Sequence, residues 1–106
     1  MALILWHNPR CSTSRKALAL LEACGLVPDI RRYLDDPPSR AELVALNLPA
    51  HSLIRWKDAP ELPRDLGDDQ ILDHLAAAPK LIERPILIGP RGAAIGRPPE
   101  AVLDVL

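Results

Sequence analysis

The stretch HNPRCSTSR at residues 7–15 lies between two segments of different periodicity, and this arrangement determines the expected fold. The apolar run LILW at 3–6 ends just before it and predicts a buried strand over 2–6. The segment that follows has apolar residues at helical spacing and ends at Gly25, which predicts a helix over about 12–24. Cys11 is therefore expected at a strand-to-helix turn, at or beside the N-terminus of the helix.

The position of Cys11 favours a reactive thiolate. A helix N-terminus presents unpaired N–H groups and partial positive charge, which stabilise a thiolate or a bound oxyanion. Arg10 and Arg15 add positive charge on either side of the sulfur. We therefore expect Cys11 to be the nucleophile.

Cys24 fits a different role, because free cysteine is often a small buried hydrophobe. It shares a helical stripe with three apolar residues, namely Ala17, Leu20 and Leu21. In a straight helix the two sulfurs are too far apart to form a disulfide. We therefore predict that Cys24 is a core residue.

The loop after Cys11 excludes two kinds of chemistry. A dithiol redox site requires a second cysteine at position 14, but Ser14 makes the motif C-x-x-S. A phosphatase-type loop requires arginine at position 17, where the chain has alanine. If Cys11 is redox-active, the resolving thiol comes from another molecule or, less plausibly, from Cys24 after a rearrangement.

Length and composition indicate one domain spanning residues 1–106, because 48% of its 106 residues are hydrophobic, which is enough for a single core. The net charge of −1 gives no reason to expect nucleic acid or an anionic membrane as a partner. No signal peptide, transmembrane run or zinc-ligand spacing is apparent. Two cysteines without paired spacing fit a reducing, cytoplasmic setting.

The rest of the chain predicts two α/β halves around a helical insertion at about 36–79. A strand is expected over 27–33, and Ser39 with Glu42 forms a capping box that opens a helix ending near 47–49. Residues 51–56 predict a short ordered element, and residues 58–67 a loop. Asp68 or Asp69 is expected to cap the next helix, which Pro79 closes and which buries three residues, namely Ile71, Leu72 and Leu75.

After the insertion, a strand over 86–88, a hairpin turn at 89–92 and an antiparallel strand over 93–95 are expected. A last helix begins at 98–100 and is expected to bury four residues, namely Val102, Leu103, Val105 and Leu106. The order β-α-β, helical insertion, β-β-α predicts a thioredoxin-like, glutaredoxin-like mixed sheet. Ligands of such sheets bind beyond the carboxyl ends of parallel strands, where Cys11 is expected.

Three arginines have unusual neighbours: Arg55 follows an apolar pair, and Arg84 and Arg97 each precede proline. Proline extends the backbone before it and so constrains the direction of the preceding side chain. A small oxyanion beside a thiolate needs several guanidinium groups to offset charge repulsion. Each arginine is also compatible with a surface or carboxylate-paired role. His7 lies four residues before Cys11. It is expected to orient the loop, to tune the thiolate or to fill the end of the strand.

The chain resembles the arsenate reductase C (ArsC) family, of the glutaredoxin-coupled type. The matching motifs, in order, are His7-Asn8-Pro9-x-Cys11-x-Thr13-Ser14-Arg15, Tyr33-Leu34-x-x-Pro37-Pro38, Leu53-Ile54-Arg55, Arg84-Pro85-Ile86, Gly96-Arg97-Pro98-Pro99-Glu100 and Val102-Leu103. The resemblance runs from about residue 3 to the C-terminus and implies a thioredoxin-like fold with a helical insertion.

The resemblance also implies a reaction, with arsenate or a similar small oxyanion as substrate and no bound cofactor. Cys11 attacks arsenate, glutathione as co-substrate completes the reduction to arsenite, and glutaredoxin clears the mixed disulfide. The residues that surround the oxyanion are then Arg55, Arg84 and Arg97. The loop residues that hold the thiolate are then His7, Asn8, Ser14 and Arg15.

Two other functions compete with this one. A glutathione-dependent thiol-disulfide oxidoreductase with a non-arsenical substrate needs the same Cys11 but no cluster of three cations. Proteins resembling this family also bind RNA polymerase and regulate transcription, using a C-x-x-C redox switch that Ser14 removes here.

Overall fold

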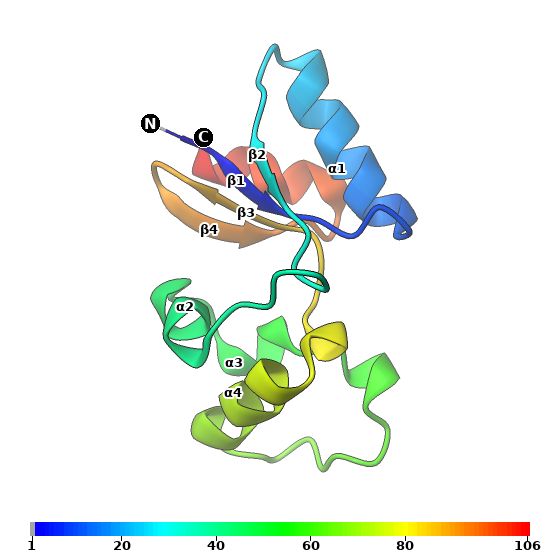
Figure 1. Cartoon of the computed structure of the whole chain (residues 1–106), viewed down its shortest axis with the longest axis vertical. Helices are drawn as coiled ribbons and strands as arrows, with labels where there is room; N and C mark the ends of the chain where they lie inside the picture. Colours follow the sequence, from blue (N-terminus) through cyan, green and yellow to red (C-terminus); the bar gives the residue numbers. More distant parts are fainter. Residues whose placement is uncertain (1) are drawn as a thin grey trace.

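The structure, a computed structural model, describes residues 2–106 and contains a four-stranded mixed sheet of order β2-β1-β3-β4. The strands are β1 (Ile4–Trp6), β2 (Asp29–Arg31), β3 (Ile86–Gly89) and β4 (Gly92–Ile95). β2 runs parallel to β1, whereas β3 is antiparallel to both β1 and β4 (Figure 1). This confirms the predicted thioredoxin-like α/β arrangement, in which α1 (Ser12–Ala23) connects the parallel pair.

One face of the sheet packs against α1 and against the 3₁₀ helix η3 (Pro99–Val105). Successive strand residues point to opposite faces, so Leu5 and Leu87 face these two helices. The buried cluster on this side contains Leu5, Ala17, Leu21, Leu87, Val102 and Val105. Its packing fixes the N-terminus of α1, and hence Cys11, beyond the end of β1.

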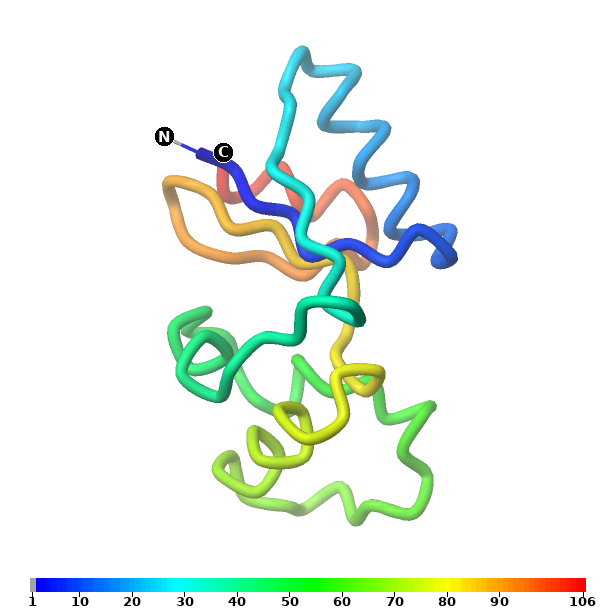
Figure 2. Tube along the Cα trace, in the orientation of Figure 1, coloured from blue at the N-terminus to red at the C-terminus, as the bar shows by residue number. Residues whose placement is uncertain are grey.

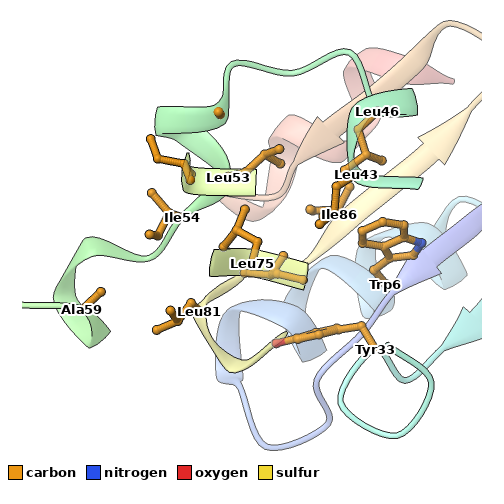
Figure 3. Close-up of a cluster of buried hydrophobic side chains, with 13 residues drawn as sticks. Trp6, Tyr33, Leu43, Leu46, Leu53, Ile54, Ala59, Leu75, Leu81 and Ile86 are labelled. Carbon is orange, nitrogen blue, oxygen red and sulfur yellow. The ribbon is translucent and has the colours of Figure 1, made fainter. Parts of the chain in front are cut away.

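The other face of the sheet meets the helices between β2 and β3. These are α2 (Arg40–Ala45), α3 (Ala50–Leu53), η1 (Trp56–Asp58), α4 (Asp68–Ala77) and η2 (Pro79–Leu81). Trp6 and Ile86 from the sheet join the second, larger buried cluster with Leu43, Leu53 and Leu75 (Figure 3). Burial of each such side chain stabilises the fold by about 2 kcal/mol relative to exposure. Figure 2 shows the chain leaving the sheet for these helices after β2 and returning to the sheet before β3.

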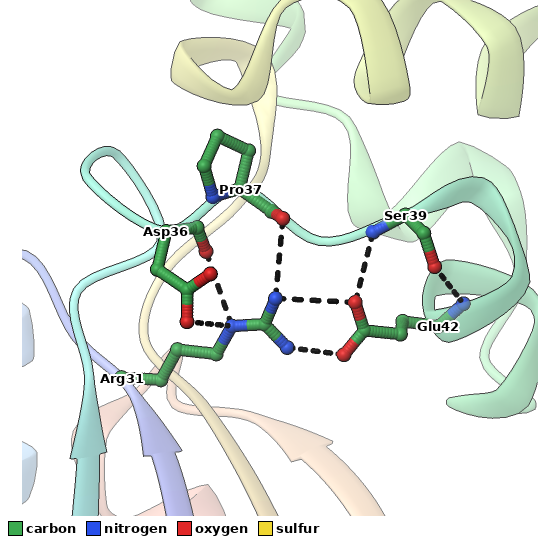
Figure 4. A network of polar contacts seen from close by, with 5 residues as sticks. All are labelled: Arg31, Asp36, Pro37, Ser39 and Glu42. Carbon is green, nitrogen blue, oxygen red and sulfur yellow. Dashed lines mark hydrogen bonds and ion pairs between the residues drawn. The ribbon is translucent and has the colours of Figure 1, made fainter.

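A polar network ties β2 to α2 (Figure 4). The Arg31 guanidinium pairs with both carboxylate oxygens of Glu42 and with Asp36. Ser39 and Glu42 form the predicted capping box at the start of α2, so Glu42 serves both the helix and the ion pair. Arg31 also lies over the Trp6 ring, 5.4 Å from the ring centroid.

Several element boundaries differ from the sequence-based expectation. β2 is only three residues long, and Val27, expected inside that strand, is 92% exposed. Gly67 rather than Asp68 or Asp69 is the N-cap of α4, and its N–H donates to Gln70 Oε1 at 3.1 Å. The last helix is of the 3₁₀ type, and Leu103, expected to be buried, is 37% exposed. Three residues per turn place Leu103 on the solvent side, because Val102 and Val105 share the buried face.

The prediction that Cys24 is a core residue was wrong, because Cys24 is exposed. Cys24 is the C-cap of α1, and Gly25 follows with φ of 76°. The N–H groups of Gly25 and Leu26 donate to the carbonyls of Glu22 and Leu21, at 2.9 and 3.0 Å. This hydrogen-bond pattern is a Schellman motif, which folds the residue after the glycine back over the last turn. Leu26 therefore covers the end of the apolar stripe, and Cys24 stays in solvent.

Within residues 2–106, the helices are too short or too polar for any of them to span a bilayer.

Candidate active site

Cys11 is the N-cap of α1, as the sequence predicted, and its side chain is partly exposed. Burial on its own raises the pKa of the Cys11 thiol. Hydrogen bonds from the backbone N–H groups of Ser14 and Thr13, together with the charges of Arg97 and Arg84, outweigh it. The pKa of Cys11 therefore lies below the ordinary value, as a nucleophilic thiolate requires.

A hydrogen-bonded ring shapes the loop before α1. Ser14 Oγ lies 2.6 Å from His7 Nδ1 and accepts the Asn8 N–H at 3.1 Å, and the Cys11 N–H donates to Asn8 O at 3.0 Å. Burial, followed by the charges of Arg32 and Arg15, lowers the pKa of His7. His7, Asn8 and Ser14 thus hold the loop rather than contact the sulfur.

Arg15 and Arg10, which the sequence placed beside the sulfur, have other positions. Arg15 Nη1 donates to Pro9 O at 2.8 Å and so braces the same loop. Arg10 lies on the rim of an adjoining groove of about 360 Å³, which is also lined by His7, Asn8, Pro9, Arg32, Leu34 and Asp35. Cations from the other end of the chain approach the sulfur instead.

Arg97 is the guanidinium closest to Cys11 by hydrogen-bond geometry, because its Nη2 donates to Sγ at 3.6 Å. Its Nε donates to the carbonyl of Arg84 at 3.0 Å. The Nε–H of Arg97 is therefore hydrogen-bonded to the backbone, whereas Nη2 of the same guanidinium group faces the sulfur. Arg84 is near enough for its charge to lower the pKa of Cys11 as well.

Two carboxylates, which the sequence reasoning missed, join Arg55 to the other arginines. Asp58 Oδ2 lies 3.0 Å from Arg55 Nε and 3.7 Å from Arg84 Nη1. Glu83 Oε1 lies 3.4 Å from Arg97 Nε and 3.9 Å from Arg55 Nη1. The two carboxylates offset the repulsion between three neighbouring cations. Arg55, Arg84 and Arg97 thus form one charged cluster, and nothing in the local sequence around Asp58 or Glu83 signals their place in it.

Two short backbone contacts bring these arginines together. A β-bridge between Ile54 and Ile82 sets Arg55 beside Glu83, with the Glu83 N–H donating to Leu53 O at 2.7 Å. The Gly96 N–H donates to Pro85 O at 2.8 Å, which sets Arg97 beside Arg84. A Cβ atom on Gly96 would lie 2.7 Å from Pro85 Cγ, so this contact requires glycine. The Arg84–Pro85 and Arg97–Pro98 peptide bonds are cis.

Tyr33 is a further residue at the site that was named only as part of a motif. Its side chain is completely buried, and its hydroxyl has no hydrogen-bond partner among residues 2–106. Burial raises the pKa of Tyr33, against the positive charge of Arg84. The charges of Cys11 and Arg55 also act on this hydroxyl, that of Cys11 raising its pKa and that of Arg55 lowering it.

Comparison with known proteins identifies the family of this chain. The ArsC family model matches residues 6–105. The arsenate reductase of Rhizobium meliloti (strain 1021) is 40% identical over 115 residues, which cover 100% of this chain and 82% of the relative. An arsenate reductase of Escherichia coli is 40% identical over 111 residues, covering 96% of this chain and 79% of the relative. The solved arsenate reductase from Vibrio cholerae superposes with a TM-score of 0.88 at 39% identity, covering 100% of this chain and 98% of that one. The chain therefore belongs to the ArsC family.

Proposed function

We propose that this protein is an arsenate reductase in which Cys11 is the nucleophile. One observation carries the proposal: the Cys11 sulfur lies at the N-terminus of α1 with Arg97 Nη2 at 3.6 Å. A thiolate that also faces guanidinium groups is suited to a substrate that is an electrophile and an anion at once. Arsenate has both properties, and the relatives named above carry the name arsenate reductase.

In the proposed first step, the Cys11 thiolate attacks arsenic. A sulfur–arsenic bond forms, an arsenic–oxygen bond breaks, and the oxygen leaves as water after taking up protons. Arg84 and Arg97 stabilise the negative charge on the remaining oxygens, and Arg55 completes the cluster that holds them. The ring formed by His7, Asn8 and Ser14, braced by Arg15, keeps the sulfur in line for attack.

In the second step, glutathione supplies the other thiol, because the C-x-x-S loop has no resolving cysteine. The glutathione and Cys11 sulfurs give up two electrons and become a mixed disulfide, while As(V) becomes As(III) and leaves as arsenite. Glutaredoxin then reduces this disulfide and returns the Cys11 thiolate. We place the reaction in the cytoplasm, where such thiols are kept reduced, and treat residues 1–106 as a single functional domain.

Reconstitution with components left out one at a time tests the proposal. Purified protein, arsenate, glutathione, glutaredoxin and a reductant-recycling system should form arsenite, and omission of either thiol component should stop turnover. Cys11→Ser should abolish the reaction, whereas Cys24→Ser should retain it. Arsenite formation by Cys11→Ser would contradict the assignment of the nucleophile. If arsenate is not reduced but Cys11 is still glutathionylated and deglutathionylated, the chain is a thiol-disulfide oxidoreductase instead.

A further inference from the structure

The buried polar atoms without hydrogen-bond partners gather at one place. Within residues 2–106 these side-chain atoms are Tyr33 Oη, Arg55 Nε, Glu83 Oε1 and Arg84 Nε. Three of them belong to the charged cluster, and the fourth belongs to Tyr33, whose hydroxyl end points toward the turn just before Glu83 and Arg84 (Figure 3). A buried donor left unpaired costs about 1–3 kcal/mol, so such atoms are rare unless a ligand or water completes them.

Tyr33 differs from the other three because nothing offsets its unpaired atom. Arg55, Glu83 and Arg84 each take part in an ion pair. Arg55 Nε, for example, lies 3.0 Å from Asp58 Oδ2, although without the alignment of a hydrogen bond. The Tyr33 hydroxyl is uncharged. The Asn8 side chain is near enough to lower the pKa of Tyr33, but it does not complete a hydrogen bond by geometry.

Packing fixes the Tyr33 ring, and it therefore also fixes the direction in which the hydroxyl points. The ring is 0% exposed and packs in the larger buried cluster. In Figure 3 its hydroxyl end points away from Trp6, toward the turn beside Leu81. That turn leads directly into Glu83 and Arg84. Burial keeps the phenol protonated at neutral pH, since it raises the pKa of Tyr33, so the hydroxyl remains a donor.

We propose that the Tyr33 hydroxyl donates a hydrogen bond to the oxyanion that Arg84 and Arg97 hold at Cys11. Tyr33 is then a substrate-contacting residue that supplies a neutral, rigid donor. The hydroxyl, which has no hydrogen-bond partner among residues 2–106 of the free protein, donates to the oxyanion once the oxyanion is bound. This inference rests on the proposed function for the nature of the anion.

The substitution Tyr33→Phe separates a ligand-binding role from a structural one. Phenylalanine keeps the ring and removes only the hydroxyl, which makes no hydrogen bond within residues 2–106. The melting temperature should therefore stay the same or rise, because an unpaired polar group leaves the core. Oxyanion affinity should fall about tenfold or more, as expected for loss of a hydrogen bond to a charged group. A merely structural hydroxyl would give the opposite pattern.

Protection of Cys11 from iodoacetamide measures oxyanion binding without any turnover. The assay uses the full chain with Cys24→Ser, so that the alkylated thiol is Cys11, and arsenate as the probe in the absence of other thiols. Tyr33→Phe should need at least tenfold more arsenate for half-protection. Ser52→Ala, which removes an exposed hydroxyl from α3, should behave like the parent.

The outcomes distinguish this inference from the proposed function. Equal protection of Tyr33→Phe and its parent, or a clear loss of melting temperature in Tyr33→Phe, would overturn the role of Tyr33 even if the protein reduces arsenate. A parent that arsenate protects but that forms no arsenite would leave the inference standing and overturn the reductase proposal. The inference would also be overturned if arsenate, phosphate and sulfate all failed to protect Cys11 of the parent from alkylation.

Discussion

Arg97 supplies positive charge to the Cys11 sulfur from a part of the chain 86 residues away. The backbone N–H groups of Thr13 and Ser14 stabilise the thiolate from α1 itself, and the charge of Arg84 adds to that of Arg97. These two sources are separable by mutation, because Arg97 contributes only through its side chain.

Arg97→Ala should raise the pKa of Cys11, because a cation 3.6 Å from the sulfur is lost while the N–H groups remain. The pH dependence of iodoacetamide alkylation measures this shift. We also expect kcat/KM for arsenate to fall by on the order of a hundredfold. Arg91→Ala, in the exposed turn between β3 and β4, is the matched control and should change neither quantity. Equal effects of the two substitutions would remove Arg97 from the site.

Cys24→Ala should change the free energy of unfolding by less than about 0.5 kcal/mol, because the side chain is exposed at the C-cap of α1. Urea unfolding measures this, and turnover should be retained. A loss of about 1 kcal/mol or more in the free energy of unfolding would mean that Cys24 is a core residue after all. A loss of turnover in the folded variant would indicate an internal resolving thiol.

Local pattern predicted Cys11 at the helix N-terminus, because that position depends on neighbouring residues alone. The same reasoning was wrong about Cys24, since helical spacing does not show that the chain turns back after Gly25 and that Leu26, not Cys24, covers the apolar stripe. Asp58 and Glu83 were missed because their roles depend on contacts between distant segments. That Arg55, Arg84 and Arg97 lie in one cluster was suggested by family resemblance, not by spacing.

At the next scale, the elements after β3 place Arg97 by close packing. Gly96 follows β4 and lies against Pro85, which precedes β3. A side chain at this position would also lie 3.0 Å from Val102 Cγ1 in η3. β4, η3 and the start of β3 thus meet at one residue that has no room for a methyl group.

Gly96→Ala should lower the free energy of unfolding by about 1–3 kcal/mol, as overpacking does. It should also reduce turnover, because Arg97 must move with the displaced backbone. Urea unfolding and arsenite formation measure the two effects. Gly67→Ala is the control: the nearest atom to its Cβ is 3.7 Å away, and the cost should stay below about 1 kcal/mol with full turnover. Full stability of Gly96→Ala would contradict the packing described here.

The order and type of the elements were largely predictable, because the capping box at Ser39 and the apolar runs of β1 and β3 are local signals. Boundaries were less so. The strand predicted over 27–33 is longer than β2, because the ends of β2 depend on where its pairing with β1 stops. The sequence predicted a helix from 98–100 onward but did not show that η3 is of the 3₁₀ type.

For the whole molecule, the Arg31 network links the sheet to the helices between β2 and β3 (Figure 4). Arg31 pairs with Glu42, lies over Trp6 and closes the turn through Asp36. The pairing partner of Arg31 was not predictable, since it depends on how α2 docks beside β2.

The Glu42 ion pair makes stability depend on pH. Its hydrogen bond to Arg31 lowers the pKa of Glu42 to about 2, below the ordinary carboxyl value. Such a group stabilises the fold fully above its unfolded-state pKa, and the contribution is lost as pH falls from about 4.5 through about 2. Glu42→Gln should therefore be less stable than the parent at pH 6, with the difference shrinking toward pH 2. Urea unfolding across this range measures it.

Glu22→Gln, an exposed change on α1, is the control and should leave the free energy of unfolding at pH 6 within about 0.5 kcal/mol of the parent. A difference between parent and Glu42→Gln that stays constant from pH 6 to pH 2 would mean that the carboxylate charge is not what stabilises the link.

The central claim is that Cys11 and one external thiol together reduce one arsenate, and a single turnover without glutaredoxin tests it most directly. After mixing with arsenate and a small excess of glutathione, we predict one arsenite per chain and one glutathione on Cys11, measured by arsenic speciation and peptide mass spectrometry. Cys11→Ser should give neither product. Arsenite formed without the Cys11 adduct, or an adduct on Cys24 instead, would contradict the account.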